Sequence, residues 1–346
     1  MDWFEKLTGF RETTGKTGYE TTRQKLEIDG GRLKSRVNRQ SYAIGELELV
    51  SLKALRERGH FASSNAGKTR VSIVTGDVRK LHAEPTYGGA LFQVASQFNL
   101  LEMVGPEITP EQGVTIYAGD RTQGPACAIA AGAATIYRNY FAPVSNGIGQ
   151  TESRQLDGFA ELGNAVASGL GKSSASLWNM RNGYSIFTRE GADLMSTYVC
   201  QIDEAAQDFL REKLHIGLHW DVEVTDTKYS PGPLVSQAFC SALPVSYNNL
   251  SGMRSANWMP LATLVLEAAY EATLWAAVIN SGRTGSATVL LTQLGGGAFG
   301  NDLAWIRGAM QRAIERTEGL GLDIVVVSYG QPSPDWQRWA ARWNRL

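Results

Sequence analysis

The stretch ATVLLTQLGGGAFGNDLAWIRGAMQRAIER, from Ala287 to Arg316, contains the pattern that decides the fold. Its uninterrupted apolar run, Val289 to Leu291, is typical of a strand that is covered on both faces. Three glycines, Gly295 to Gly297, then lead into a segment whose apolar residues have helical spacing. The sequence therefore predicts a strand, a loop and a helix. Glycines let backbone N–H groups approach a ligand, and a helix N-terminus favours anions, so the loop is a candidate diphosphate site.

A glycine-rich connection without a ligand explains the same residues equally well. The loop matches neither the dinucleotide-binding fingerprint nor the P-loop. Other parts of the chain have to decide between the two interpretations.

Composition restricts the class of protein. The chain has 346 residues, of which 43% are hydrophobic and 19% charged, as in globular proteins. A net charge of -1 argues against a general role in binding nucleic acid or membrane surfaces. Cys127, Cys200 and Cys240 are far apart and form no CxxC pair, so we expect neither a disulfide framework nor a zinc site. We expect a cytoplasmic protein without metal or cofactor.

Apolar runs alternate with helical patterns along most of the chain. This alternation predicts an α/β layered fold with a mostly parallel or mixed sheet. We expect an N-terminal extension over residues 1–69, with an extended or partly ordered arm over 1–40 and a helix over 45–58. The main domain should span 70–330, interrupted by a helical or irregular insertion at about 142–230. Residues 331–346 should form a C-terminal helix, because their tryptophans share one helical face.

Four segments occur in an order that resembles the macrodomain superfamily of ADP-ribose binders and hydrolases. They are VTGDV (74–78), FQVASQFN (92–99), DRTQGPACAI (120–129) and LTQLGGGAFGND (291–302). In that family these positions hold, in order, an acid that meets adenine, a ribose-facing Asn, the first ligand loop and the diphosphate loop. The resemblance implies a three-layer α/β/α fold with a mixed sheet.

The segments TQGP (122–125), QAFCSALPV (237–245) and YEATL (270–274) are similar to a divergent branch of macrodomain-like hydrolases. That branch removes ADP-ribose from arginine, including on ADP-ribosylated ubiquitin. Two features of the sequence differ from the motifs of these related families. The usual Gly-Gly-Gly-Val first loop is missing, and the Gln-Glu-Glu signature of poly(ADP-ribose) glycohydrolases would fall on Gln123-Gly124-Pro125. The two catalytic carboxylates of that branch are therefore absent, which argues against activity on polymer chains.

The resemblance assigns candidate roles to individual residues. Asp120 is the first choice for chemistry, because a carboxylate near the ribose can activate water, with Gln123 and Asn99 assisting. The candidate ligand-binding residues are Asp77, Val78, Thr122, Gly295, Gly296, Gly297, Ala298, Phe299, Gly300, Asn301 and Asp302. Candidate substrate contacts are Glu152, Glu267 and Glu271, of which the last two share a helix face that would suit a guanidinium.

Each of these residues also has an ordinary structural interpretation. Asp77, Asp120 and Asp302 can be helix caps, Asn99 can end a strand in a turn, and Glu267 with Glu271 can form a solvated face. The leading hypothesis is a hydrolase that cleaves ADP-ribose from a modified protein, preferentially at arginine. The alternatives are a non-catalytic ADP-ribose reader and a hydrolase of a free ADP-ribose derivative. The expected partners are ADP-ribose and an ADP-ribosylated protein, with ubiquitin as one candidate.

Overall fold

A mixed seven-stranded sheet forms the centre of the molecule. The computed structural model describes residues 1–62, 67–145, 147–248 and 255–344. The sheet order is β4 (Glu46–Ser51), β11 (His215–Glu223), β12 (Leu234–Cys240), β6 (Leu91–Ala95), β13 (Thr288–Leu291), β14 (Asp323–Ser328) and β5 (Arg70–Thr75). The five strands from β12 to β5 run parallel, while β11 pairs antiparallel with both β12 and β4.

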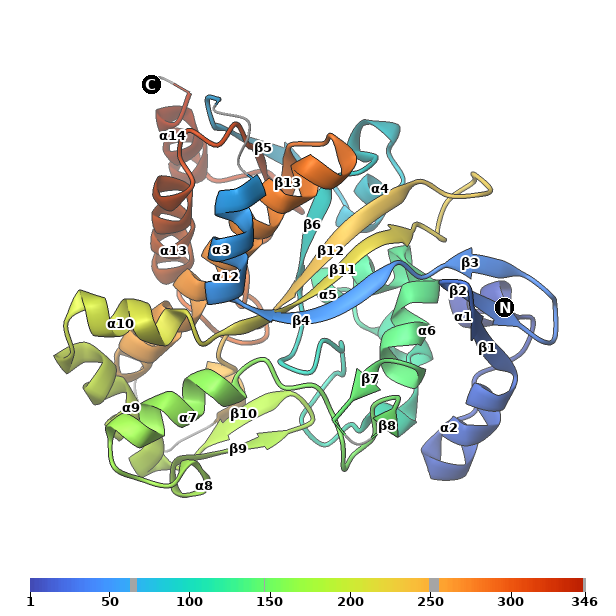
Figure 1. Ribbon diagram of the computed structural model, residues 1–346, viewed down its shortest axis with the longest axis horizontal. Helices are drawn as coiled ribbons and strands as arrows, with labels where there is room; N and C mark the ends of the chain where they lie inside the picture. Colours follow the sequence, from blue (N-terminus) through green and yellow to red (C-terminus); the bar gives the residue numbers. More distant parts are fainter. Residues whose placement is uncertain (63–66, 146, 249–254, 345–346) are drawn as a thin grey trace.

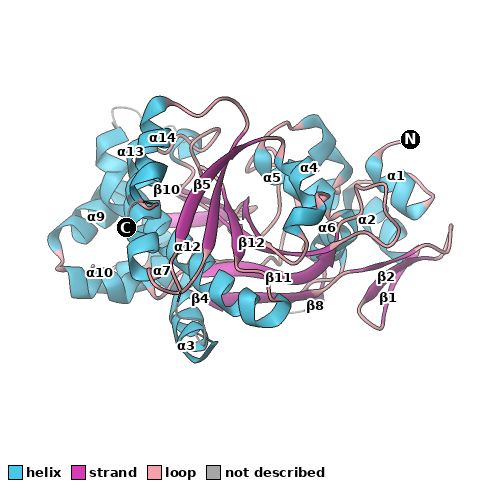
Figure 2. Cartoon of the chain, turned by 90° about the horizontal axis from the view of Figure 1, so that it is seen from above, coloured by secondary structure: helices cyan, strands magenta, loops and turns pink. Residues whose placement is uncertain are grey.

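Helices cover both faces of the sheet (Figures 1 and 2). One face carries α3 (Leu52–Ala62), α12 (Ser255–Thr284), α13 (Leu303–Arg316) and α14 (Pro334–Arg342). The opposite face carries α4 (Val78–His82), α5 (Gln123–Ala130) and α6 (Gly132–Tyr140). This arrangement confirms the predicted three-layer α/β/α class with a mixed sheet.

Helix α12 is the central helix of its layer. It contacts four strands of the sheet and also α3, α9, α10 and α13. A helix that is apolar all round is expected to be buried in this way. The segment Asn257–Thr284 is long and apolar enough to cross a membrane, but 89% of its most apolar window is buried inside the protein. Its length and composition therefore follow from its place in the core.

The N-terminal residues are folded, whereas the sequence predicted an extended or partly ordered arm. They form α1 (Trp3–Thr8), α2 (Gly15–Gln24) and a small antiparallel sheet of β1 (Leu26–Asp29), β2 (Arg32–Ser35) and β3 (Ser41–Ala43). The predicted helix over 45–58 is also wrong in its first half, because residues 46–51 form the edge strand β4. The N-terminal extension therefore contributes a strand to the main sheet.

The insertion is smaller than expected, because its last part, β11, belongs to the main sheet. Its remaining elements are β7 (Pro143–Val144), β8 (Gly147–Ile148), α7 (Ala160–Gly169), α8 (Ser174–Leu177), β9 (Trp178–Arg181), β10 (Tyr184–Phe187), α9 (Arg189–Gln201) and α10 (Glu204–Arg211). The short helices η1 (Pro85–Tyr87), η2 (Pro110–Gln112), η3 (Thr115–Gly119) and α11 (Val245–Asn248) connect the larger elements.

Candidate functional site

A cavity of about 410 Å³ lies where the parallel strands end. Ala95 is the last residue of β6, Thr292 follows β13, and Val327 and Ser328 lie at the end of β14. All four line the cavity. Ligands of open α/β sheets bind at the carboxyl ends of the strands, and pockets for small molecules measure about 300–1,000 Å³. Both the place and the size of the cavity are therefore those of a ligand site.

The glycine-rich loop forms one side of this cavity. Residues Gly295, Gly296, Gly297, Ala298 and Phe299 line it, as the sequence predicted for a ligand loop. Gly295 has a φ of 73°, and a Cβ there would lie 2.5 Å from the Ala242 Cβ, so only glycine fits. In contrast, a Cβ on Gly297 would meet no atom within 4 Å. The loop is thus closely packed at its start and open at Gly297.

The end of the loop supports it from outside the cavity. The Asn301 amide donates to the Leu243 carbonyl at 2.9 Å, and the Asn301 backbone N–H donates to the Gly295 carbonyl at 3.0 Å. Asp302 caps α13 by accepting from the Ala304 N–H at 2.7 Å. Gly300, Asn301 and Asp302 do not line the cavity, so the predicted ligand loop divides into a lining part and a supporting part.

The first predicted loop also lines the cavity. Asp120, Thr122 and Gln123 all line it, beside the N-terminus of α5. Asp120 Oδ1 accepts from the Thr122 N–H at 2.8 Å, which holds the carboxylate at the start of the helix. Three of the predicted site residues therefore share one cavity with the glycine loop.

Asn99 does not line the cavity, although the sequence analysis placed it against a ribose. It is fully buried, its amide donates to Gln155 Oε1 at 2.8 Å, and its Oδ1 accepts from the Leu101 N–H at 3.1 Å. Both ends of the amide are therefore used within the protein. Its position corresponds to the turn-forming alternative.

Three further candidates lie outside the cavity lining. Asp77 caps α4 by accepting from the Arg79 N–H at 3.0 Å, and Val78 is the buried first residue of that helix. Glu152 lies 3.5 Å from Lys16 and borders a different hollow of the surface.

Glu267 and Glu271 are fully committed to arginines of the chain itself, and neither lines the cavity. Glu267 accepts from Arg211 Nε at 2.7 Å. Glu271 accepts from Arg56 Nε and from Arg312 Nη1, each at 2.6 Å. The predicted partner of this pair was the guanidinium of a substrate, whereas the partners in the structure are internal arginines. The structure does not place them where a substrate in the cavity would lie.

Glu102 lines the cavity and was missed by the sequence analysis. Its side chain is buried, and its Oε1 has no hydrogen-bond partner among the described residues. A buried polar atom without a partner costs about 1–3 kcal/mol, so such an atom in a cavity points to a ligand. The one available signal was an acid inside an apolar run, Leu100 to Val104.

The turn that carries Glu102 is tightly held. Leu100 has a φ of 64°, a conformation that costs a non-glycine residue about 1–2 kcal/mol. The Asn99 side chain bridges this turn, and Gln97 bonds both polar groups of the Met103 backbone, at 2.8 and 3.2 Å. The Glu102 N–H donates to the Tyr117 hydroxyl at 3.0 Å. Asn99 thus acts on the cavity indirectly, by fixing the turn before Glu102.

Burial raises the pKa of the Glu102 carboxyl well above its usual value. The positive charge of Arg138 opposes this increase, and the negative charge of Asp120 adds to it. The cavity therefore contains two carboxyl groups in different environments, one buried and one partly exposed. Such a pair suits acid–base chemistry, because one group can hold a proton while the other accepts one.

Aromatic rings close another side of the cavity. Tyr184 of β10, Tyr247 of α11 and Phe299 of the glycine loop all line it. Their ring centroids are 4.9 to 5.6 Å apart. The Tyr184 hydroxyl donates to the Met103 carbonyl at 2.6 Å, so the hairpin of the insertion also fixes the residue next to Glu102. Tyr329 is 86% exposed at the rim.

No protein-family model matches the sequence, and none of the curated proteins is similar to it. Among solved structures, the chain is similar to a poly(ADP-ribose) glycohydrolase from Thermomonospora curvata, with 14% identity, a TM-score of 0.45, and coverage of 91% of this chain and 94% of that one. It is also similar to the poly(ADP-ribose) glycohydrolase from Deinococcus radiodurans in complex with ADP-ribose. There the identity is 12%, the TM-score is 0.44, and the coverage is 86% of this chain and 93% of that one. Similarity at this level does not assign a substrate or a catalytic residue.

Proposed function

We propose that this protein hydrolyses the glycosidic bond between ADP-ribose and a protein side chain, with arginine as the preferred linkage. The observation that carries the proposal is the buried Glu102 carboxyl, whose Oε1 has no partner among the described residues and which shares one cavity with Asp120 and the glycine loop. The resemblance to macrodomains suggests ADP-ribose as the ligand, because two of the segments that carry it line this cavity. The diphosphate would lie on Gly295 to Phe299, near the N-terminus of α13.

The two carboxyl groups suit hydrolysis of a glycosidic bond. Asp120 accepts a proton from water while the water oxygen bonds to the anomeric carbon. The bond from that carbon to the leaving atom breaks, and the electron pair leaves with that atom. Glu102 then supplies the proton that the leaving group takes up. Positive charge that develops on the ribose is stabilised by a nearby carboxylate, as in other glycosidases.

Gly124 gives a geometric reason to assign the acid to Glu102. The glycohydrolase carboxylates that the chain lacks would fall on Gly124 and Pro125. A Cβ at position 124 would lie 2.3 Å from Glu102 Oε2. Glu102 therefore reaches, from another segment, the space into which a side chain at position 124 would project. A carboxyl group is present in this space although the signature is not.

The type of linkage that the protein can hydrolyse depends on the leaving group. In an arginine linkage, the leaving nitrogen belongs to a protonated guanidinium, which departs as a neutral guanidine without prior protonation by an acid. An oxygen-linked group departs as an anion unless an acid protonates it. The raised pKa of Glu102 makes it a proton donor, which favours oxygen-linked ADP-ribose as a second candidate substrate.

The test measures release of free ADP-ribose from arginine-linked, serine-linked and polymeric substrates. The wild-type protein should release it from the arginine-linked substrate, and Glu102→Gln and Asp120→Asn should each reduce the rate by about 10²- to 10⁴-fold. Undiminished release by both variants would contradict the assigned acids. Calorimetry that shows ADP-ribose binding, with no release from any substrate, would instead identify a reader.

A further inference from the structure

Arg138 of α6 is completely buried behind the segment that carries Glu102. Its Nε donates to the Leu100 carbonyl at 3.2 Å, and its Nη2 donates to Thr135 Oγ1 at 2.9 Å. Its guanidinium carbon lies 3.8 Å from the centre of the Phe239 ring. The third nitrogen, Nη1, lies 3.3 Å from His219 Nδ1.

These partners are all neutral groups. Within the described ranges, no carboxylate lies within 4 Å of the Arg138 nitrogens. A buried cation is normally paired, because removing it from water is costly. Arg211 shows the usual solution, since it is equally buried but contacts Glu204 at 2.8 Å and Glu267 at 2.7 Å. The unpaired burial of Arg138 therefore calls for an explanation.

His219 neither adds to nor cancels the positive charge of Arg138. Because Arg138 Nη1 can only donate, His219 Nδ1 must accept, so the imidazole proton is on Nε2. Burial and the neighbouring guanidinium lower the pKa of His219 well below its usual value, which leaves it neutral. Arg138 remains charged at neutral pH, although burial lowers its pKa to about 10.

The groups that interact electrostatically with Glu102 come from several elements. They are Asp120 and Tyr117 at η3, Cys127 of α5, Tyr184 of β10 and Arg138 of α6. Burial raises the pKa of Tyr117, Cys127 and Tyr184, so these three are neutral at neutral pH. Asp120 makes the ionised form of Glu102 less stable. Arg138 is the positively charged member of this set of residues.

We propose that Arg138 is a positioning residue for Glu102, which holds the strained turn at the Leu100 carbonyl and provides the counter-charge for the Glu102 carboxylate. Leu100 precedes Glu102 by two residues, so the contact fixes the direction of the carboxyl group. The unpaired cation favours the carboxylate that forms each time Glu102 gives up a proton. The catalytic part of this inference rests on the proposed hydrolase function, whereas the electrostatic part does not.

The test follows the titration of Glu102 directly in the full-length protein. Selective ¹³C labelling of glutamate carboxyls gives one NMR signal per residue, and the signal that is missing in Glu102→Gln identifies Glu102. Arg138→Met removes the charge, Arg138→Gln removes it but keeps a donor for the Leu100 carbonyl, and Arg138→Lys keeps the charge. Arg211→Met is the matched control for loss of a buried arginine. Circular dichroism establishes which variants are folded.

Both neutral variants should move the Glu102 titration to higher pH by about one pH unit or more, because the carboxylate loses its opposite charge. Arg138→Lys should stay closer to the wild-type titration, and Arg211→Met should not move it. A Glu102 titration at the wild-type pH in a folded neutral variant would overturn the proposal. Equal shifts in the lysine variant and the neutral variants would also overturn it, because packing rather than charge would then be the cause.

Activity gives a second readout that separates this inference from the proposed function. Since the acid has to be protonated, the hydrolysis rate should fall as pH rises through the pKa of Glu102. In Arg138→Met or Arg138→Gln this fall should occur at higher pH. If the wild-type protein releases no ADP-ribose at any pH, the proposed function fails, and the NMR titration still decides whether Arg138 controls Glu102.

Discussion

Glu102 and Gly124 depend on each other at the scale of single residues. A Cβ on Gly124 would lie 2.0 Å from the Ala95 carbonyl oxygen and 2.3 Å from Glu102 Oε2. Neither contact can be tolerated without movement of the backbone or of the carboxyl group. The absence of a side chain at position 124 is therefore a condition for the position of Glu102.

Gly124→Ala should accordingly displace the Glu102 carboxyl and abolish most of the activity. We expect ADP-ribose release to fall by at least about 100-fold, and the free energy of unfolding to fall by about 1–3 kcal/mol because of overpacking. Rate measurements and urea denaturation test the two effects. Gly119→Ala is the control, since a Cβ there meets no atom within 4 Å. A fully active Gly124→Ala protein would contradict the role of Glu102.

The sequence could predict residues whose place at the cavity depends on the local chain, and it missed Glu102, whose place depends on distant contacts. The glycine loop is recognisable because it lies between a strand and a helix, and Asp120 is recognisable because it lies just before helix α5. Nothing beside Glu102 marks it, except that it is an acid in an apolar run. Its place in the cavity results from contacts to Tyr117 and from the turn at Leu100. These contacts join segments that the sequence alone does not bring together.

At the scale of elements, the glycine loop combines a fixed start with an open middle. Gly295 is closely packed, whereas Gly297 borders the cavity without a neighbour. This difference separates the effect of a mutation on folding from its effect on binding.

Gly297→Ala should weaken ADP-ribose binding and leave stability nearly unchanged, because the new methyl group points into the space that the diphosphate would occupy. We expect the dissociation constant to rise at least about tenfold, which corresponds to about 1.4 kcal/mol. Calorimetry with ADP-ribose measures the binding, and thermal melting measures the stability. Gly308→Ala, in the exposed part of α13, should stabilise the helix by about 0.5–1 kcal/mol without changing binding. Unchanged affinity in Gly297→Ala would place the ligand elsewhere.

Long periodic elements were predictable, and short or alternating ones were not. The buried parallel strands β13 and β14 have uninterrupted apolar runs, and both lie where the sequence placed them. Residues 46–51, ELELVS, were assigned to a helix because Leu49, Leu52 and Leu55 have helical spacing. The alternation of Glu and Leu at the start of this segment was the stronger signal, because successive side chains of a strand point to opposite faces of the sheet. The N-terminal elements are too short to show a period.

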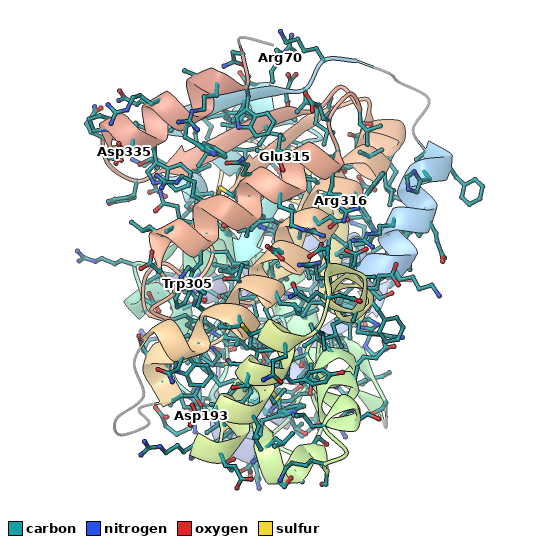
Figure 3. All side chains as sticks on the ribbon, turned by 90° about the vertical axis from the view of Figure 1, so that its left-hand side faces the viewer. Arg70, Asp193, Trp305, Glu315, Arg316 and Asp335 are labelled. Carbon is teal, nitrogen blue, oxygen red and sulfur yellow. The ribbon has the colours of Figure 1, made fainter. Side chains whose placement is uncertain are left out.

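At the scale of the whole molecule, a network of ion pairs connects four helices on the outer face of the α12 layer. Arg56 of α3 and Arg312 of α13 both contact Glu271 of α12 and Asp208 of α10. Figure 3 shows this face, where Arg316 of α13 lies 3.7 Å from Asp208. The network fastens α10, the last helix of the insertion, to the layer that covers the sheet. The cavity lies at the strand ends, and none of these residues lines it.

Glu271→Gln tests whether this acid is structural. The Glu271 side chain is 1% exposed, and its replacement leaves Arg56 and Arg312 without a buried anion. We expect the free energy of unfolding at pH 7 to fall by about 3 kcal/mol, measured by urea denaturation. ADP-ribose affinity and the rate of its release from arginine-linked protein should not change. A loss of activity at unchanged stability would instead support a substrate contact.

The pH dependence of the stability difference between wild type and Glu271→Gln provides a sharper test of the role of this acid. Burial acts to raise the pKa of Glu271, but hydrogen bonds and charges from Arg56 and Arg312 lower it below the usual 4.5. A carboxyl group with a lowered pKa stabilises the folded protein above its unfolded pKa, and this stabilisation is lost as pH falls through the folded pKa. The stability difference between wild type and Glu271→Gln should therefore be constant above about pH 5 and shrink below about pH 4. A difference that persists undiminished at pH 3 would show that packing, rather than charge, makes Glu271 necessary.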